Sequence, residues 1–347
     1  MNIKELVREN IKTLKPYSSA RDEFEGLKKD MVFLDANENP FNNGVNRYPD
    51  SKHYQVRELL SRIRNIKIQH ILLGNGSDEV LDLIFRAFCD PKTDNIITLP
   101  PTYGMYEVLA NINGVNTLKV ELDEEFQPRV DTILETANKN SKILFLCSPN
   151  NPTANSFESA RIERLIKGFN GIVVIDEAYV EFTEEESWVN KLQQHPNLIV
   201  TQTLSKAYGM AGIRLGICYA SEEIISILNI IKPPYNINRL TQQRAAKILL
   251  YKEGLSREID VILEEREKLI KVLKAIPFIE KIYPTDANFI LIKVDDANKR
   301  YKGLIKQGIV VRNRTKQPLC ENCLRITVGT LSENKKLMYA LKQLKRQ

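Results

Sequence analysis

Short apolar runs alternate with helix-like segments through the central part of the chain. Each run is nearly continuous, which is typical of a strand that is buried on both faces. The runs lie at residues 71–74, 96–99, 115–120, 142–147, 171–175, 198–203 and 216–220. Between them, apolar residues recur at helical spacing, as at Val80, Ile84 and Phe88. This alternation predicts an α/β fold: a mostly parallel, seven-stranded sheet with helices on both faces.

A different pattern follows the break at Pro233 and Pro234. Helical spacing continues over about 240–275, with a possible interruption near Gly254, and is followed by apolar runs at 282–294, 308–313 and 324–328. Further helices are expected at 297–307 and at 333–345, the last one capped by Ser332. The pattern predicts an N-terminal arm at 1–30 that packs with the small domain or a partner, a large domain at 31–250, and a smaller α+β domain at 251–347.

Composition excludes several classes of protein. The net charge of +6 is spread over 50 basic and 44 acidic residues, with no block of like charge that would suit a nucleic-acid-binding arm. No run is long enough to span a membrane, and the charged N-terminus does not resemble a signal peptide. Five scattered cysteines favour a reduced, cytoplasmic protein. Cys320 and Cys323 form a C-x-x-C pair, but without a second pair or nearby histidines we expect no metal site.

Polar segments follow the expected strands, at 74–78, 100–103, 148–153, 176–179 and 203–206. In open parallel sheets, ligands bind beyond the carboxyl ends of the strands, so these segments should meet around one site. The glycine turn before the helix that begins near Ser77 would present backbone N–H groups to an anion. A tight turn with an ordinary helix cap is the alternative for that turn.

Residues in these segments fit a cofactor that has an aldehyde, a ring nitrogen and a phosphate. Lys206 follows a buried strand, where desolvation would lower its pKa and favour reaction with an aldehyde, although it could instead point into water. Asp176 ends another strand, where its carboxylate could pair with a protonated ring nitrogen or cap a turn. Asn151 and Tyr179 could donate hydrogen bonds to a ring oxygen, and Tyr103 could stack on the ring. Ser205, Arg214 and the backbone amides of 75–78 could hold the phosphate.

Several of these segments resemble a known family. Ser-Pro-Asn-Asn-Pro-Thr at 148–153, Asp-Glu-Ala-Tyr at 176–179, Ser-Lys at 205–206 and Gly-Ile-Arg-Leu-Gly at 212–216 resemble the signature of the fold-type I pyridoxal-phosphate aminotransferases of class I and II. Segments 34–40, 47–49, 74–79 and 323–330, together with Arg312, resemble the histidinol-phosphate aminotransferase family in particular. The resemblance covers nearly the whole chain.

The resemblance implies a role for each cofactor residue. Lys206 would form the Schiff base with pyridoxal 5'-phosphate and shuttle the proton, Asp176 would pair with the pyridinium nitrogen, and Tyr179 would donate to the ring oxygen. Asn151 would share that oxygen, and Tyr103 would stack on the ring. Ser77, Asp78, Ser205 and Arg214 would lie on the phosphate side of the cofactor, and Gly76 would be a further cofactor-binding residue. Ala154 stands where the family usually has glycine. If that position needs a positive φ, alanine costs about 1 kcal/mol there.

The resemblance also implies the substrates and the assembly. Arg325 would bind the carboxylate of glutamate or 2-oxoglutarate, whereas Arg312 and Tyr17 would meet the phosphate of histidinol phosphate, with Asn37 near the substrate. Tyr48 would reach the cofactor phosphate of the neighbouring subunit, which implies a homodimer. The implied reaction converts L-histidinol phosphate and 2-oxoglutarate into imidazole-acetol phosphate and L-glutamate.

Two alternatives remain open at this point. A related enzyme of the same fold, such as an aromatic aminotransferase or a threonine-phosphate decarboxylase, would share most of these motifs. A non-catalytic regulator of the same fold would carry an added DNA-binding segment, of which this sequence shows no sign.

Overall fold

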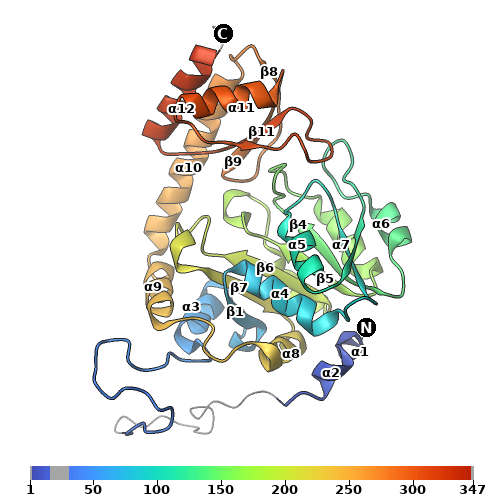
Figure 1. Ribbon diagram of the computed structural model, residues 1–347, viewed down its shortest axis with the longest axis vertical. Coiled ribbons are helices and arrows are strands. Elements are labelled where there is room, and N and C mark those ends of the chain that lie inside the picture. Colours follow the sequence, from blue (N-terminus) through green and yellow to red (C-terminus); the bar gives the residue numbers. More distant parts are fainter. Residues whose placement is uncertain (1, 16–30, 345–347) are drawn as a thin grey trace.

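The computed structural model describes residues 2–15 and 31–344, and a seven-stranded sheet forms the centre of its larger domain (Figure 1). The strand order is β1-β7-β6-β5-β4-β2-β3. Strand β7 pairs antiparallel with β1 and β6, and the other neighbours pair in parallel. The predicted mostly parallel sheet is therefore confirmed. Its strands are β1 (Ile71–Asn75), β2 (Asn95–Thr98), β3 (Asn116–Lys119), β4 (Ser141–Cys147), β5 (Ile172–Asp176), β6 (Leu198–Thr203) and β7 (Leu215–Ala220).

Helices cover both faces of this sheet. One face packs against α4 (Ser77–Phe88), α5 (Met105–Ile112) and α8 (Glu222–Ile231). The other packs against α3 (Tyr54–Arg64), α6 (Val130–Thr136), α7 (Ser159–Gly168) and α9 (Arg239–Leu249). Along β5, Ile172 and Val174 join the first core, and Val173 and Ile175 join the second. Burial on both sides is the reason that these strands are continuously apolar in the sequence.

The small domain contains a four-stranded antiparallel sheet of order β10-β11-β9-β8. Its strands are β8 (Ile279–Ile282), β9 (Phe289–Val294), β10 (Arg312–Asn313) and β11 (Cys323–Thr327), packed against α11 (Ala297–Lys306) and α12 (Leu331–Leu344). The single strand predicted over 282–294 is wrong. The chain turns between β8 and β9, where Pro284 lacks a backbone donor and the Thr285 hydroxyl donates to the Phe289 carbonyl at 2.7 Å.

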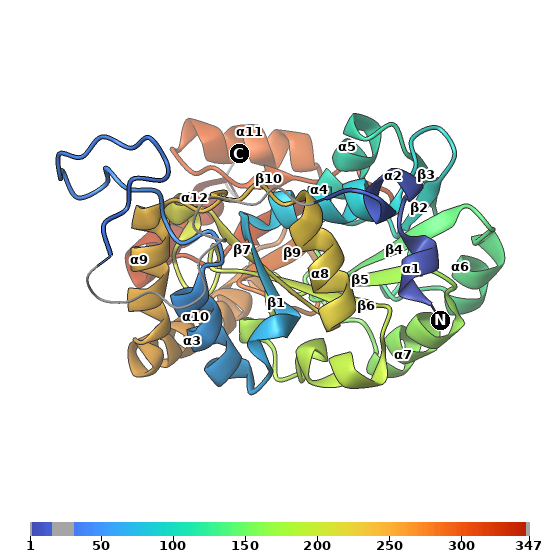
Figure 2. The ribbon, with the colours of Figure 1, turned by 90° about the horizontal axis from the view of Figure 1, so that it is seen from below.

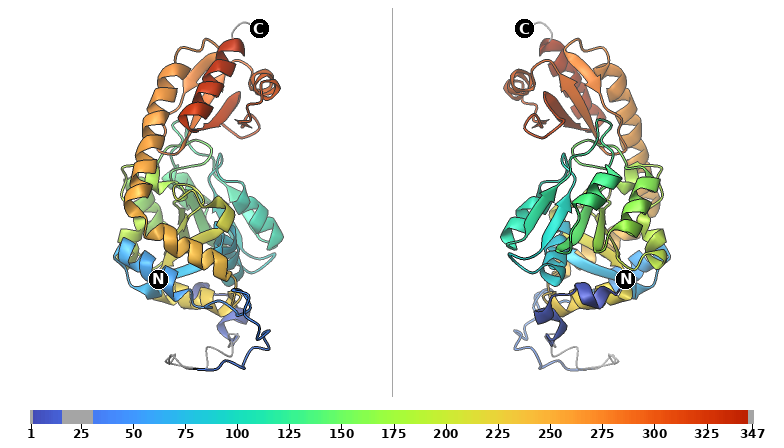
Figure 3. Two further views of the ribbon diagram at one scale, coloured as in Figure 1. Left: turned by 90° about the vertical axis from the view of Figure 1, so that its left-hand side faces the viewer. Right: turned by 90° about the vertical axis from the view of Figure 1, so that its right-hand side faces the viewer.

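A long helix, α10 (Lys252–Leu273), connects the two domains (Figure 3). Leu255 and Ile259 pack on the core of the large domain, and Leu269 and Leu273 belong to the core of the small one. The helix carries residues of both cores, so the boundary at 250/251 stays a prediction. None of the described helices is long and apolar enough to cross a membrane.

Two helix boundaries differ from the prediction. The break between α9 and α10 falls at residues 250–251 rather than at Gly254, which lies inside α10. The ring of Tyr251 packs where a Cβ of residue 254 would stand, so glycine is needed there for packing rather than for a break. Helix α12 begins at Leu331 instead of 333. Thr330 and Glu333 bond to each other reciprocally, with Oε2 accepting from the Thr330 N–H at 2.8 Å, so Ser332 is not the cap.

The start of the chain packs on the large domain. Helices α1 (Ile3–Leu6) and α2 (Glu9–Lys12) contribute Ile3 and Ile11 to the core that contains α4 and α8 (Figure 2). Arg8 Nε donates to Asp90 at 3.0 Å and ties this segment to the end of α4. The described part of the arm therefore lies against the large domain rather than the small one.

Residues 31–50 form neither helix nor strand. This segment exposes large apolar side chains: Val32, Leu34 and Phe41 are each more than four-fifths exposed. Glu38 organises the segment locally, because its carboxylate accepts from Arg47 at 2.7 Å and from the backbone N–H of Tyr48 at 2.5 Å.

Gly216 allows β7 to lie directly against the start of α4. A Cβ at this position would stand 2.3 Å from the backbone nitrogen of Ser77 and 2.4 Å from the carbonyl carbon of Gly76. Both of these atoms are backbone, which cannot rotate away, so the turn at residues 76–77 depends on glycine at 216.

Substituting Gly216→Ala should lower the free energy of unfolding by about 2 kcal/mol or more, since the added methyl group overpacks a backbone contact. Urea unfolding of the two proteins measures this. The matched control is Gly104→Ala, because a Cβ at Gly104 has nothing within 4 Å and the residue is in the right-handed helical region. Equal losses in the two variants would show that the contact with the turn is not what requires glycine.

Candidate active site

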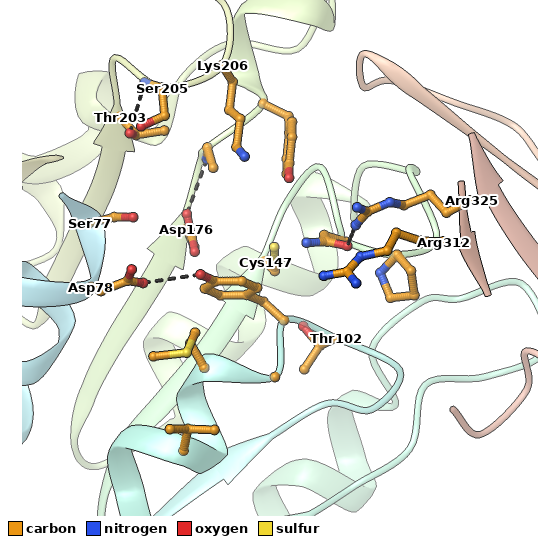
Figure 4. Close-up of a pocket in the computed structure, with 18 of the residues that line it drawn as sticks. Ser77, Asp78, Thr102, Cys147, Asp176, Thr203, Ser205, Lys206, Arg312 and Arg325 are labelled. Carbon is orange, nitrogen blue, oxygen red and sulfur yellow. Dashed lines mark hydrogen bonds between the residues drawn. The ribbon is translucent and has the colours of Figure 1, made fainter. Parts of the chain in front are cut away.

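A cavity of about 490 Å³ lies at the carboxyl ends of the strands of the large sheet, facing the small domain (Figure 4). Polar segments from five strand ends converge on it, as the sequence predicts. Most of the predicted site residues line this cavity: Ser77, Asp78, Tyr103, Asn151, Asp176, Tyr179, Ser205, Lys206, Arg214, Arg312 and Arg325. Residues from the large domain form one side, and the arginines of the small domain form the other.

One end of the cavity is suited to an anion. The N-terminus of α4 opens onto it, with Gly76 at φ +80 preceding Ser77. The guanidinium of Arg214 lies over Gly76, where an added Cβ would stand 2.6 Å from Nη2. Asp78 holds this arginine at 3.6 Å and accepts from the Tyr103 hydroxyl at 3.1 Å. Backbone N–H groups, the helix dipole and a cation therefore meet at one point.

Asp176 is a buried carboxylate on the floor of the cavity. It ends β5, where only 3% of the residue is exposed, and its oxygens accept from the Tyr106 hydroxyl at 2.8 Å and from the backbone N–H of Ala178 at 3.2 Å. Burial raises the pKa of Asp176, and the Tyr106 hydrogen bond counteracts this only in part. Among the described residues no cation forms an ion pair with it. A cationic ligand would stabilise its ionised form.

Lys206 extends into the cavity from the segment after β6 (Figure 4). Its Nζ lies 5.7 Å from the centre of the Tyr179 ring. Desolvation lowers the pKa of Lys206, and the positive charges of Arg325 and Arg214 add to this, whereas Asp176 opposes it. A lysine whose pKa is lowered is neutral in a larger fraction of molecules, as a nucleophilic amine must be.

The small domain contributes arginines across from Lys206. Arg312 of β10 and Arg325 of β11 are register partners in an antiparallel pair, so they lie side by side. Arg325 donates to the Asn151 side-chain oxygen and packs over the Phe289 ring, 5.0 Å from its centre. Burial, with the charge of the neighbouring Arg314, lowers the pKa of Arg325 to about 10. This side of the cavity is thus prepared for a negatively charged substrate group.

Comparison with known proteins identifies the family. The model of the class I and II aminotransferases matches residues 30–341. A histidinol-phosphate aminotransferase from Flavobacterium johnsoniae is 62% identical over 344 residues, covering 99% of both chains. The crystal structure of the histidinol-phosphate aminotransferase from Clostridium acetobutylicum matches with a TM-score of 0.81 at 25% identity, over 87% of this chain and 91% of that one. The chain belongs to the family of class I and II aminotransferases.

Aminotransferases of this class depend on pyridoxal phosphate. The crystal structure of the histidinol-phosphate aminotransferase from Sinorhizobium meliloti, in complex with pyridoxal 5'-phosphate, has the same fold, with a TM-score of 0.80 at 21% identity over 86% of this chain and 83% of that one. The cavity of this aminotransferase fits that cofactor. Asp176 is a buried carboxylate that a protonated ring nitrogen would neutralise, and the cradle at Gly76 and Arg214 suits a phosphate.

Ala154 of this aminotransferase has φ +73 and is fully buried. The condition under which alanine would be strained here, a positive φ, is therefore met. Its backbone is held at both ends, because its N–H donates to the Asn150 carbonyl and its own carbonyl accepts from Asp286, each at 2.7 Å. These bonds hold the neighbouring loop in place despite the strain, which is about 1 kcal/mol.

Tyr17 lies outside the described residues. Gly76, Asn37 and Tyr48 are not among the residues that line the cavity, although Gly76 directly precedes Ser77, which does line it. Asn37 and Tyr48 line a second hollow, and the Tyr48 ring stacks on Tyr235 with centroids 4.5 Å apart. Neither residue reaches the cavity of its own chain, so their predicted roles require a second subunit.

The sequence interpretation did not identify every residue of the site, and Tyr106 and Arg314 are two informative cases. The Tyr106 hydroxyl holds Asp176 from the buried face of α5. Arg314 lines the cavity beside Arg312. The available signal was the separation of these arginines by one residue, which is typical of two side chains on one face of an extended segment. The burial of a polar tip, as in Tyr106, leaves no signal of this kind.

Replacing Arg325 with Gln should raise the pKa of Lys206, because a positive charge that disfavours its protonated form is removed. The pH at which the apoprotein reacts half-maximally with pyridoxal phosphate should therefore move upward, as followed by absorbance. Arg164→Gln, which alters an exposed arginine paired with Asp131, is the control. An unchanged pH profile in Arg325→Gln would show that the two charges are not coupled.

Proposed function

We propose that this aminotransferase transfers the amino group of L-histidinol phosphate to 2-oxoglutarate, giving imidazole-acetol phosphate and L-glutamate in histidine biosynthesis. Relatives named histidinol-phosphate aminotransferase, at 58–62% identity over nearly the whole chain, support the substrate. The observation that carries the proposal is the pair of arginines, Arg312 and Arg325, that faces Lys206 across the cavity.

The residues of the large domain act on the cofactor and the reacting carbon. When bound, pyridoxal phosphate supplies an aldehyde and a ring that withdraws electrons. Asp176 would keep the ring nitrogen protonated, while Tyr179 and the Asn151 amide would donate to the ring oxygen. The Lys206 Nζ would hold and move the proton between the substrate carbon that bears the nitrogen and the aldehyde carbon of the bound cofactor. Tyr103 would cover the ring, and Ser205, Arg214 and the backbone amides of Gly76, Ser77 and Asp78 would hold the phosphate end in place.

The arginines accept two different substrates in turn. Both glutamate and histidinol phosphate carry an anion remote from the amine. A planar guanidinium binds a carboxylate or a phosphate through two parallel hydrogen bonds. We assign Arg325 to the carboxylate and Arg312, with Tyr17, to the phosphate, and we place Asn37 near the substrate.

We also propose that the enzyme acts as a homodimer in the cytoplasm. Residues 31–50 expose Val32, Leu34 and Phe41, an apolar surface that a second copy would cover. Tyr48, next to this surface, would then reach the cofactor phosphate of the neighbouring subunit. Five unpaired cysteines favour a reducing compartment.

The specificity constant, kcat/KM, should be higher for histidinol phosphate than for phenylalanine or aspartate by about 10- to 100-fold, since a charge-assisted hydrogen bond contributes about 1.5–3 kcal/mol. Steady-state rates with 2-oxoglutarate as acceptor measure this. Threonine phosphate is the test of a decarboxylase, and release of carbon dioxide from it at a higher rate would overturn the assignment. Lys206→Ala, the control, should be inactive with every substrate.

Coexpression of Lys206→Ala with Tyr48→Phe tests whether Tyr48 acts across subunits. Each variant by itself should have reduced activity. In hybrid dimers, however, one site combines an intact Lys206 with an intact Tyr48 from its neighbour, so about a quarter of all sites should regain wild-type function. Activity per purified dimer measures the gain. If the mixture shows only the average of the two variants, Tyr48 does not serve the neighbouring site.

A further inference from the structure

A third arginine, Arg314, lies on the substrate side of the cavity beside Arg312 and Arg325. Arg312 and Arg314 are separated by one residue at the end of β10, so they project from the same face of an extended segment. Arg325 stands opposite Arg312 on β11. All three guanidinium groups therefore border one space.

This cluster of cations is not neutralised by the protein. Among the described residues, no carboxylate forms an ion pair with any of the three arginines. Burial and the charge of Arg312 lower the pKa of Arg314. Arg325 has its pKa lowered by burial and by both neighbouring arginines. Placing like charges opposite each other on paired strands is destabilising, so the cluster is best stabilised by a bound anion.

Donors in the cluster also lack partners. The Nε atoms of Arg314 and Arg325 are buried, and within the described chain neither has a hydrogen-bond acceptor. An unsatisfied buried donor costs about 1–3 kcal/mol, more when it is charged. The side chain of Gln317 lines the same part of the cavity and adds a neutral donor. The site is thus richer in donors than one carboxylate, with two oxygens, can satisfy.

The two substrates differ in the number of oxygens and in the charge that they offer to this site. A phosphate monoester has three terminal oxygens and a charge of about −1.5 to −2 at neutral pH. A carboxylate has two oxygens and a single charge. Arg325 is already oriented by its bond to Asn151. Arg312 and Arg314 together offer the additional positive charge that only the phosphate requires.

We propose that Arg314 is a specificity-determining residue that binds the phosphate of the amino donor together with Arg312 and makes the site favour a dianion over a carboxylate. This inference rests on the proposed function for the identity of the phosphorylated substrate. It assigns Arg314 no part in proton transfer.

The backbone of Arg314 is held independently of its side chain. Its N–H donates to the Cys323 carbonyl at 2.8 Å, and its carbonyl accepts from the Gln317 N–H at 2.9 Å. A change of side chain therefore leaves the turn between β10 and β11 intact. Arg314→Gln is the test variant, and Arg314→Lys restores a charge without the planar fork.

The experiment follows each half-reaction separately in the holoenzyme, by stopped-flow absorbance. In Arg314→Gln the apparent Kd for histidinol phosphate should rise about 10- to 100-fold, whereas the apparent Kd for glutamate should change by less than about threefold. The limiting rates should stay the same, and Arg314→Lys should recover part of the loss. Arg164→Gln, on the surface, is the control.

Equal losses with both substrates would overturn the proposal, as would no loss with either. Inhibition of the glutamate half-reaction by inorganic phosphate provides a second measurement. Arg314→Gln should weaken this inhibition about tenfold or more relative to the wild type. If the wild-type enzyme does not react with histidinol phosphate, the proposed function fails, and the phosphate inhibition still decides the role of Arg314: an unchanged inhibition constant would overturn it.

Discussion

The buried carboxylate of Asp176 is the constraint around which the site is built. It stands at the end of a central strand, where burial disfavours its ionised form and hydrogen bonds from Tyr106 and Ala178 compensate only in part. A protonated ring nitrogen would complete the arrangement. The other groups of the site lie around this carboxylate. The phosphate cradle at the start of α4 lies on one side of the carboxylate, and Lys206 enters from the next strand end.

The two domains divide the chemistry between them. The large sheet positions the residues suited to the cofactor at the ends of its central strands, which are buried on both faces. The small sheet presents its arginines on a short hairpin that faces this edge. Helix α10 carries residues of both hydrophobic cores and so links the two domains, and hydrogen bonds between them, such as that of Arg325 with Asn151, add to this link. An anion bound between the arginines would relieve their mutual repulsion.

Much of this arrangement could be predicted from the sequence. Continuous apolar runs indicate the strands, and because ligands bind at the carboxyl ends of parallel strands, Asp176, Lys206 and Asn151 could be grouped into one site from their positions along the chain. Ala154 could be singled out as a position where a positive φ would be strained, because a resemblance supplied the comparison with glycine. Other features depend on contacts between distant segments. The hydroxyl of Tyr106 and the packing of Tyr251 on Gly254 leave no periodic signal, and the α1–α2 segment could have packed on either domain.

Lys206 and Asp176 should together let the enzyme keep an amino group between its reactions with two separate substrates. The most direct test is a single turnover with ¹⁵N-labelled histidinol phosphate and no acceptor, followed by gel filtration and addition of 2-oxoglutarate. Imidazole-acetol phosphate should form in the first step, one equivalent per subunit, and ¹⁵N-glutamate should appear only in the second. Label that leaves as ammonia in the first step, or product that forms only when both substrates are present together, would contradict this mechanism.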